Sequence, residues 1–147
     1  ALLQYEIDTH MTELAERYGE ADAVRAYRAC AEAIGELESL AAGLGDVDFE
    51  RQQSLYYASS EEDVASLQEE LALRQKHGFE AEWLERKAIL AEYGFEAPGA
   101  ILTQLAATID PYRMAYQLFS RVVERGGEVY DRTQMETMTP DDQGATP

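Results

Sequence analysis

The clearest pattern of apolar and polar positions lies near the C-terminal end of the chain. Apolar residues recur there at three- and four-residue spacing, as on one face of a helix: Tyr112, Ala115, Tyr116, Phe119, Val122 and Val123. Asp110 is a good N-cap, and Pro111 suits the first helical position because its missing N–H has no intrahelical partner there. A glycine pair after Arg125 can end the helix. The spacing therefore predicts a helix whose apolar face is turned inward, followed by a strand over 128–135.

Elsewhere in the chain, further capping residues and glycines indicate where helices and strands begin and end. These signals predict an extended opening over 1–8, helices over 9–18, 21–42, 60–77 and 84–93, and strands over 49–59, 79–83 and 99–109. Asp8 or Thr9 can cap the first of these helices, and Ser59 with Glu62 has the capping-box spacing before the third. Helices and strands do not alternate strictly, which is typical of an α+β fold.

The predicted architecture is several helices packed on a small, mainly antiparallel sheet. At 147 residues and 46% hydrophobic content, the chain can bury the core of one domain. We assign that single domain to residues 1–136. Residues 137–147 are rich in Pro, Gly, Asp and Thr and have little to bury, so we expect a flexible tail or connecting loop there.

Charge and hydropathy restrict the classes of partner. The formal net charge is -17, and the 12 Lys and Arg residues are scattered, whereas binding to nucleic acid or an anionic membrane surface needs clustered positive charge. No apolar run approaches the ~20 residues needed to span a bilayer. The N-terminus also lacks the basic start and cleavage pattern of a secretory signal. We expect no nucleic-acid partner, no integral membrane segment and a cytoplasmic protein.

The sequence contains none of the common catalytic or metal-binding motifs. It has no GxGxxG or GxxxxGK[ST] phosphate loop, no HExxH, no GxSxG and no pair of cysteines. His10 and His77 are far apart without a ligand pattern, which favours ordinary surface histidines over a metal site. Cys30 is most simply a small apolar residue on the buried side of a helix. We therefore expect neither catalytic residues nor a metal site.

Adjacent acidic residues on the helix over 60–77 also need an interpretation. Glu61 with Glu62, and Glu69 with Glu70, are more simply solvated helix faces than general acid and base pairs. Trp83 is most simply an anchor in the core or at a sheet edge. These residues therefore predict no active site.

Three stretches of the chain nevertheless resemble a known family. They are ALLQYEIDT at 1–9, GFEAPGAILTQLAATIDPYRMAYQL at 94–118 and VERGGEVYDRTQM at 123–135. Together they resemble the FAD-dependent oxidoreductases of the D-amino acid oxidase and glycine oxidase superfamily. In that superfamily an N-terminal Rossmann unit with a glycine fingerprint binds the ADP part of FAD, and the chain then builds part of a substrate domain before it returns. The resemblance implies that the phosphate loop precedes Ala1 and that this chain is an internal segment.

The resemblance also implies positions for cofactor contacts in the intact parent. Leu2, Leu3 and Gln4 align with the segment whose backbone lies beside the isoalloxazine ring. Met135 takes the place of a residue whose main chain contacts adenine. We expect FAD in the parent and none bound by this chain alone, because the glycine loop for the pyrophosphate is absent from the sequence.

These expectations define two functional hypotheses. In the first, the chain covers the flavin and shapes the substrate pocket of a parent that oxidises an amine, an amino acid or a hydroxy compound. Its partners are then the missing FAD-binding domain and a small-molecule substrate, and the isolated segment can self-associate into a homo-oligomer through surfaces left bare. In the second, the chain is an acidic, non-enzymatic helical interaction module. The substrate and the electron acceptor stay open.

Overall fold

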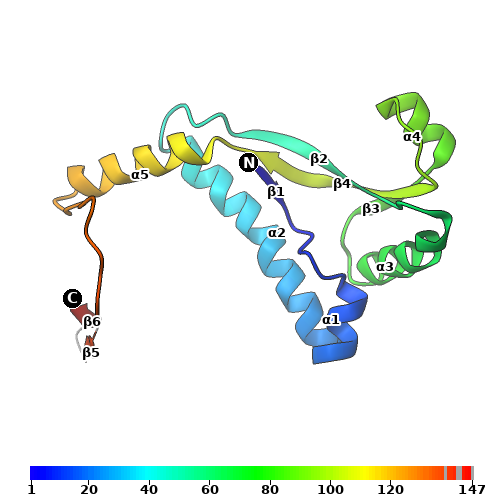
Figure 1. Cartoon of the computed structure of the whole chain (residues 1–147), viewed down its shortest axis with the longest axis horizontal. Coiled ribbons are helices and arrows are strands. Elements are labelled where there is room, and N and C mark those ends of the chain that lie inside the picture. The colour runs from blue at the N-terminus through cyan, green and yellow to red at the C-terminus, as the bar shows by residue number, and fades with distance from the viewer. Residues whose placement is uncertain (138, 142–143, 147) are drawn as a thin grey trace.

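A computed structural model describes residues 1–137, 139–141 and 144–146 of the chain. The elements follow in the order β1 (Leu2–Gln4), α1 (Met11–Tyr18), α2 (Glu20–Ala42), β2 (Glu50–Tyr57), the 3-10 turn η1 (Glu61–Asp63), α3 (Val64–Lys76), β3 (Ala81–Glu85), α4 (Arg86–Tyr93), β4 (Gly99–Thr108), α5 (Pro111–Glu124), β5 (Thr139–Asp141) and β6 (Gly144–Thr146). The α+β fold with helices on a small antiparallel sheet is confirmed. Figure 1 shows β2 and β4 as a long ribbon, with α2 running diagonally beside it and α5 extending from one end.

The sheet is organised around β4. β2 pairs antiparallel along one edge of β4, and β1 and β3 pair antiparallel along different parts of the other edge. The register shifts between Gln52 and Ser54, where Gln52 pairs with Ala106 but Ser54 pairs with Thr103. β4 therefore carries one extra residue, a bulge that bends the long strand.

The helices bury different parts of β4. Ile101 packs in a cluster with Leu67 and Leu71 of α3, whereas the neighbouring Ala100 packs with Ile89 of α4. Because successive residues of a strand point to opposite faces, α3 and α4 cover opposite faces at this end of the sheet. Near the other end, Ala107 lies in a cluster with residues of α2.

Trp83 on β3 anchors the sheet edge, as predicted. It packs against the cluster around Ile101 and pairs with Ile101 in the strand register. Its ring also lies over Gly99, where an added Cβ would lie 2.0 Å from Trp83 Cζ2. Gly99 is therefore required by the close approach of the indole rather than by a backbone turn.

Two of the three predicted helix caps need correction. The Asp110 side chain accepts hydrogen bonds from the backbone N–H groups of Tyr112 and Arg113 at 2.9 and 3.0 Å, as predicted. The capping box lies one residue later than predicted, at Ser60 and Asp63. The prediction of a cap from Asp8 or Thr9 was wrong, because α1 begins after His10 and has no side-chain cap from its own N-cap residue.

The predicted burial of the α5 apolar face was wrong. Met114 and Leu118 of α5 pack against the cluster that contains Ile109, and Arg113 forms an ion pair with Asp48 at 2.9 Å. The larger apolar face is exposed to solvent, and it consists of Tyr112, Tyr116, Phe119, Val122 and Val123. We call these five residues the α5 face. The α5 face is exposed because α5 projects beyond the end of the sheet, as Figure 1 shows.

The strand predicted over 128–135 does not form. Residues 127–137 have no helix or strand, and the chain turns at Gly126 and Arg132, both with positive φ. A strand needs a neighbour to complete its hydrogen bonds, and no other strand of the described chain pairs with this segment.

The predicted tail at 137–147 lies partly outside the described residues. Within it, β5 and β6 pair antiparallel as a separate two-stranded ribbon. The division into a domain over 1–136 and a tail stays a prediction. Among the described residues, no helix combines the length and apolar character that a membrane crossing requires.

Candidate functional site

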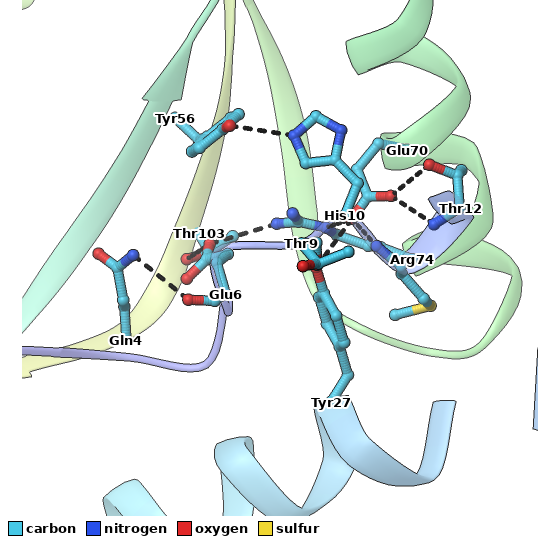
Figure 2. Close-up of polar contacts among 11 residues, drawn as sticks. Gln4, Glu6, Thr9, His10, Thr12, Tyr27, Tyr56, Glu70, Arg74 and Thr103 are labelled. Carbon is cyan, nitrogen blue, oxygen red and sulfur yellow. Dashed lines mark hydrogen bonds and ion pairs between the residues drawn. The ribbon is translucent and has the colours of Figure 1, made fainter. Parts of the chain in front are cut away.

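A cluster of buried charged side chains lies where β1, α1, α2 and α3 meet (Figure 2). Arg74 on α3 is 1% exposed, Glu70 one turn earlier is 0% exposed, and Glu6 follows β1 and is also buried. Arg74 donates from Nε to Glu70 Oε1 at 2.8 Å and from Nη1 to Glu6 Oε1 at 3.3 Å. Thr103 of β4 donates its hydroxyl to the same Glu6 oxygen at 3.3 Å. We call Glu6, Glu70 and Arg74 the Arg74 network.

Glu70 provides the cap that α1 lacks in its own sequence. Its carboxylate accepts the backbone N–H of Met11 at 3.0 Å and that of Thr12 at 2.9 Å, and the Thr12 hydroxyl at 3.2 Å. The Tyr27 hydroxyl lies 3.0 Å from the Thr9 carbonyl oxygen and 3.3 Å from Glu70 Oε1. The prediction of Glu70 as part of a solvated helix face was therefore wrong. The carboxylate is buried because it satisfies the first N–H groups of another helix.

The electrostatics of the network favour the charged forms of both partners on α3. Burial alone would raise the pKa of Glu70, but the Thr12 N–H, the Arg74 guanidinium and the Met11 N–H outweigh it and lower that pKa. Burial opposes charge on Arg74 as well, yet the Glu70 carboxylate raises the pKa of the guanidinium. Burial raises the pKa of both Tyr5 and Tyr27, so their hydroxyls stay protonated.

Two aromatic rings and two polar atoms complete the interior of the cluster. Arg74 Cζ lies 5.6 Å from the centroid of the Tyr5 ring and 5.5 Å from that of Tyr27, within the range of a cation–π contact. Glu6 Oε2 and the Tyr5 hydroxyl are buried without a hydrogen-bond partner among the described residues. In this network the two carboxylates of Glu6 and Glu70 contact the single guanidinium of Arg74.

A more exposed pair of side chains lies above this network. His10 Nε2 is 3.0 Å from the Tyr56 hydroxyl, with the rings edge to face at 5.3 Å between centroids. This pair connects the start of α1 to β2, as Figure 2 shows. His10 and His77 have separate partners, because His77 Nε2 contacts Glu20 at 2.6 Å. In the part of the chain that the structure describes, no three His, Cys, Asp or Glu residues are grouped as metal ligands.

The cofactor contacts expected from the resemblance lie on two different parts of the molecule. Leu2, Leu3 and Gln4 form β1, which pairs with β4 on one side and has no strand on its other side among the described residues. Met135 is 66% exposed and lies in the irregular segment after α5. Figure 1 shows that segment descending away from the sheet. Contact of either group with a flavin stays a prediction.

An open pocket of about 530 Å³ adjoins the Arg74 network on the side of Tyr5. Its wall includes Phe79, whose ring stacks on Tyr5 at 5.4 Å, and Arg28, which donates to the His77 carbonyl oxygen at 3.1 Å. Acidic and basic side chains both line it, together with apolar surface. This mixture favours no single class of ligand.

Comparison with known proteins assigns the family. The family model of the FAD dependent oxidoreductases named DAO matches residues 7–146. The chain belongs to this family. No curated protein matches the chain.

Solved structures with the same fold include enzymes that act on amino acids. A glycine oxidase from Geobacillus kaustophilus aligns over 98% of this chain and 38% of its own, with a TM-score of 0.71 and 17% identity. A glycine oxidase from Bacillus cereus ATCC 14579 aligns over 98% and 40%, with a TM-score of 0.66 and 14% identity. An L-proline dehydrogenase from P. horikoshii aligns over 82% and 35%, with a TM-score of 0.65 and 12% identity. This chain therefore spans less than half the length of these structural relatives.

Membership of the DAO family implies FAD, and the chain's residues fit only part of that cofactor. β1 pairs with β4 alone among the described strands, so no strand pairs with Leu2 to Gln4 on the other side. The pyrophosphate needs a glycine-rich turn before a helix N-terminus, and the sequence contains no such turn. The residues that fit the cofactor are therefore the backbone of β1, which would face the ring, and the sequence has no glycine-rich turn that would hold the phosphates.

Proposed function

We propose that the chain is the part of an FAD-dependent oxidoreductase that covers the flavin and shapes the substrate pocket. The parent is a cytoplasmic enzyme that oxidises an amine, an amino acid or a hydroxy substrate. FAD, when bound, accepts the hydride equivalent from the substrate carbon. The residues of this chain exclude water from that reaction and orient the groups around it.

The observation that carries this proposal is the exposed α5 face. Five apolar side chains at helical spacing are exposed, whereas the apolar packing of the helix on the core involves Met114 and Leu118. An apolar stripe of this kind on a helix indicates a missing partner. The family match continues through this helix to residue 146, and 60% or more of each structural relative lies outside the aligned region. The FAD-binding domain of the parent is the partner that fits.

β1 supports the same arrangement from the other terminus. Its three residues pair only with Thr108, Ala107 and Ala106 of β4. The Ala1 amino group donates to the Ile109 carbonyl oxygen at 2.5 Å, next to the Asp110 cap of α5. The proposed flavin-facing strand and the proposed docking helix therefore meet at Ile109, and one neighbouring domain can contact both.

A cofactor-loading experiment tests the proposal. The chain over 1–147 should bind no FAD in equilibrium dialysis, whereas the parent with its upstream and downstream segments should purify yellow. In the parent, Phe119→Glu should lower FAD retention because a charge replaces an apolar contact at the domain interface. Gln117→Glu makes the same charge change on the exposed polar side of α5 and is the matched control.

The results separate the two functional hypotheses. A colourless parent that binds no added FAD would refute the flavoprotein proposal and favour the acidic interaction module, which is motivated by the net charge of -17. Micromolar FAD binding by the isolated chain would refute the assignment of the phosphate cradle to the missing domain.

A further inference from the structure

The segment between β1 and α1 is fixed to α3 at both of its ends. At its start, Glu6 accepts from Arg74 and from Thr103. At its end, the backbone N–H groups of Met11 and Thr12 donate to Glu70, which also accepts from Arg74. One guanidinium thus connects both attachment points, and the planar fork of Arg makes two directed bonds that an ammonium group cannot reproduce.

Stability alone does not account for a network of this kind. Removing two carboxylates and a guanidinium from water is costly, and apolar residues of similar volume often give equal or greater stability. Charged groups with directed hydrogen bonds do, however, select one geometry among several packed alternatives. The burial of Arg74 and Glu70 therefore fits a role in holding their attached segment in one position.

That segment continues directly into β1. The Gln4 side chain donates from Nε2 to the Glu6 carbonyl oxygen at 3.3 Å, so the last residue of β1 is tied to the residue that Arg74 holds. At the other end of β1, Ala1 is held by Ile109. With only three paired residues, β1 is placed by these two attachments together with the packing of Leu3 on the core.

We propose that Arg74 is a positioning residue that sets, through Glu6 and Glu70, how β1 lies beside the flavin of the parent enzyme. This inference rests on the proposed function. Arg74 contacts neither cofactor nor substrate, because it is enclosed by Tyr5, Tyr27 and the two carboxylates. Its effect on the flavin passes through Gln4 and the backbone of β1.

The first experiment measures amide exchange in the chain over 1–147. Arg74→Lys keeps the positive charge but cannot bond both carboxylates in the same geometry. Losing a charged hydrogen bond should speed exchange in residues 2–12 by about tenfold or more, with α4 unchanged. Arg51→Lys is the control for the same substitution on the exposed surface, where Arg51 makes a forked contact to the single carboxylate of Glu38. If Arg74→Lys does not fold, Glu6→Gln replaces it, since it weakens only the attachment next to β1.

The second experiment uses the FAD-loaded parent. Arg74→Lys, or Glu6→Gln in its place, should shift the visible circular dichroism of the flavin and its midpoint potential. It should change kcat more than KM, while Arg51→Lys should leave the circular dichroism, the midpoint potential, kcat and KM unchanged. A merely structural role would lower the yield of folded enzyme without altering the spectrum of what remains.

Each failure has a different meaning. Equal exchange in residues 2–12 of the Arg74→Lys and Arg51→Lys chains would overturn the inference at its first step. Faster exchange with an unaltered flavin spectrum and potential would overturn its second step, the effect on β1 and the flavin. An unsubstituted parent that takes up no FAD would instead refute the proposed function, and the flavin part of the inference with it.

Discussion

The Glu70 carboxylate caps a helix 58 residues away in the chain by accepting the backbone N–H of Thr12 at 2.9 Å. The same carboxylate is paired with Arg74 at 2.8 Å, so α1 and α3 share one buried negative charge. The start of α1 and α3 are therefore joined by hydrogen bonds to the same carboxylate. This relationship also supplies the most direct tests of the fold.

Replacing Glu70 should therefore destabilise the whole domain. Glu70→Ala leaves the Arg74 guanidinium with only Glu6 and removes the cap of α1, which should cost about 3–5 kcal/mol of unfolding free energy. Glu70→Gln keeps the volume and should cost less, about 1.5–3 kcal/mol, by losing charge-assisted hydrogen bonds. Urea unfolding measures both. Glu69→Gln is the control on the exposed side of α3 and should stay within about 0.5 kcal/mol of the original chain.

The lowered pKa of Glu70 also predicts a pH dependence of stability. A carboxyl group whose pKa is lower in the folded state stabilises the fold fully above its unfolded pKa of about 4.3. That contribution is lost as the pH falls through the folded pKa, because the protonated form no longer balances Arg74 or the α1 N–H groups. The chain should therefore lose stability below about pH 5, and Glu70→Gln should lose less over the same range.

The matched comparison for this pH effect is Glu38→Gln. The hydrogen bond from Arg51 also lowers the pKa of Glu38, but this pair lies at the surface, where solvent screens it. The loss of unfolding free energy between pH 7 and pH 4 should be measured for each chain. Relative to the original chain, Glu38→Gln should reduce that loss less than Glu70→Gln does. An identical loss in the original chain and in Glu70→Gln would show that other carboxyl groups control the acid transition.

How far the sequence predicted this fold depends on whether each signal was local. Asp110, Pro111 and the glycines mark helix ends by interactions within a few residues, and the structure has those ends where they were expected. Glu70 has no such local signal, because the groups it satisfies lie on Met11 and Thr12. Its burial is a tertiary property, and the spacing of acidic residues along α3 could not reveal it.

The spacing of apolar residues correctly predicted the helix α5, but the prediction that its apolar face is buried was wrong. The stripe containing Phe119 and Tyr116 predicted a face buried against the core, whereas the structure leaves both side chains exposed. The strand over 128–135 failed for a related reason, since β-propensity at Val129 and Tyr130 cannot supply the neighbouring strand that a ladder needs. Both errors concern the same end of the molecule. They are consistent with the proposed docking of the missing domain there.

The contact between Gly99 and Trp83 leads to a third prediction. Gly99→Ala should place a methyl group inside the indole ring, so Trp83 must move at a cost of about 1–3 kcal/mol. The shift should be visible in tryptophan fluorescence, since the chain has one tryptophan. Gly35→Ala is the contrasting control, because its Cβ meets nothing within 4 Å on α2, and it should stabilise the chain by about 0.5–1 kcal/mol.

A double-mutant cycle tests whether the ring itself causes that cost. In a Trp83→Leu background the methyl group at residue 99 has room, so adding Gly99→Ala should change the unfolding free energy by less than about 0.5 kcal/mol. An equal cost in both backgrounds would mean that the penalty arises in the β4 backbone and not at the indole.

The last prediction concerns the α5 face when no partner domain is present. Phe119 is 50% exposed and lies on the same face as Tyr116, Val122 and Val123, so two copies of the chain can bury these side chains against each other. The net charge of -17 opposes association, but at physiological salt the Debye length is about 8 Å and close apolar contacts prevail. We therefore expect the mass measured by light scattering to rise across a hundredfold range of concentration, and more steeply as salt is added. Phe119→Glu should keep the chain monomeric, whereas Gln117→Glu adds the same charge on the polar side and should associate like the original chain. A monomeric mass for the original chain at every concentration and salt would contradict self-association through the α5 face. The exposed apolar side chains would then be explained by binding to a different partner.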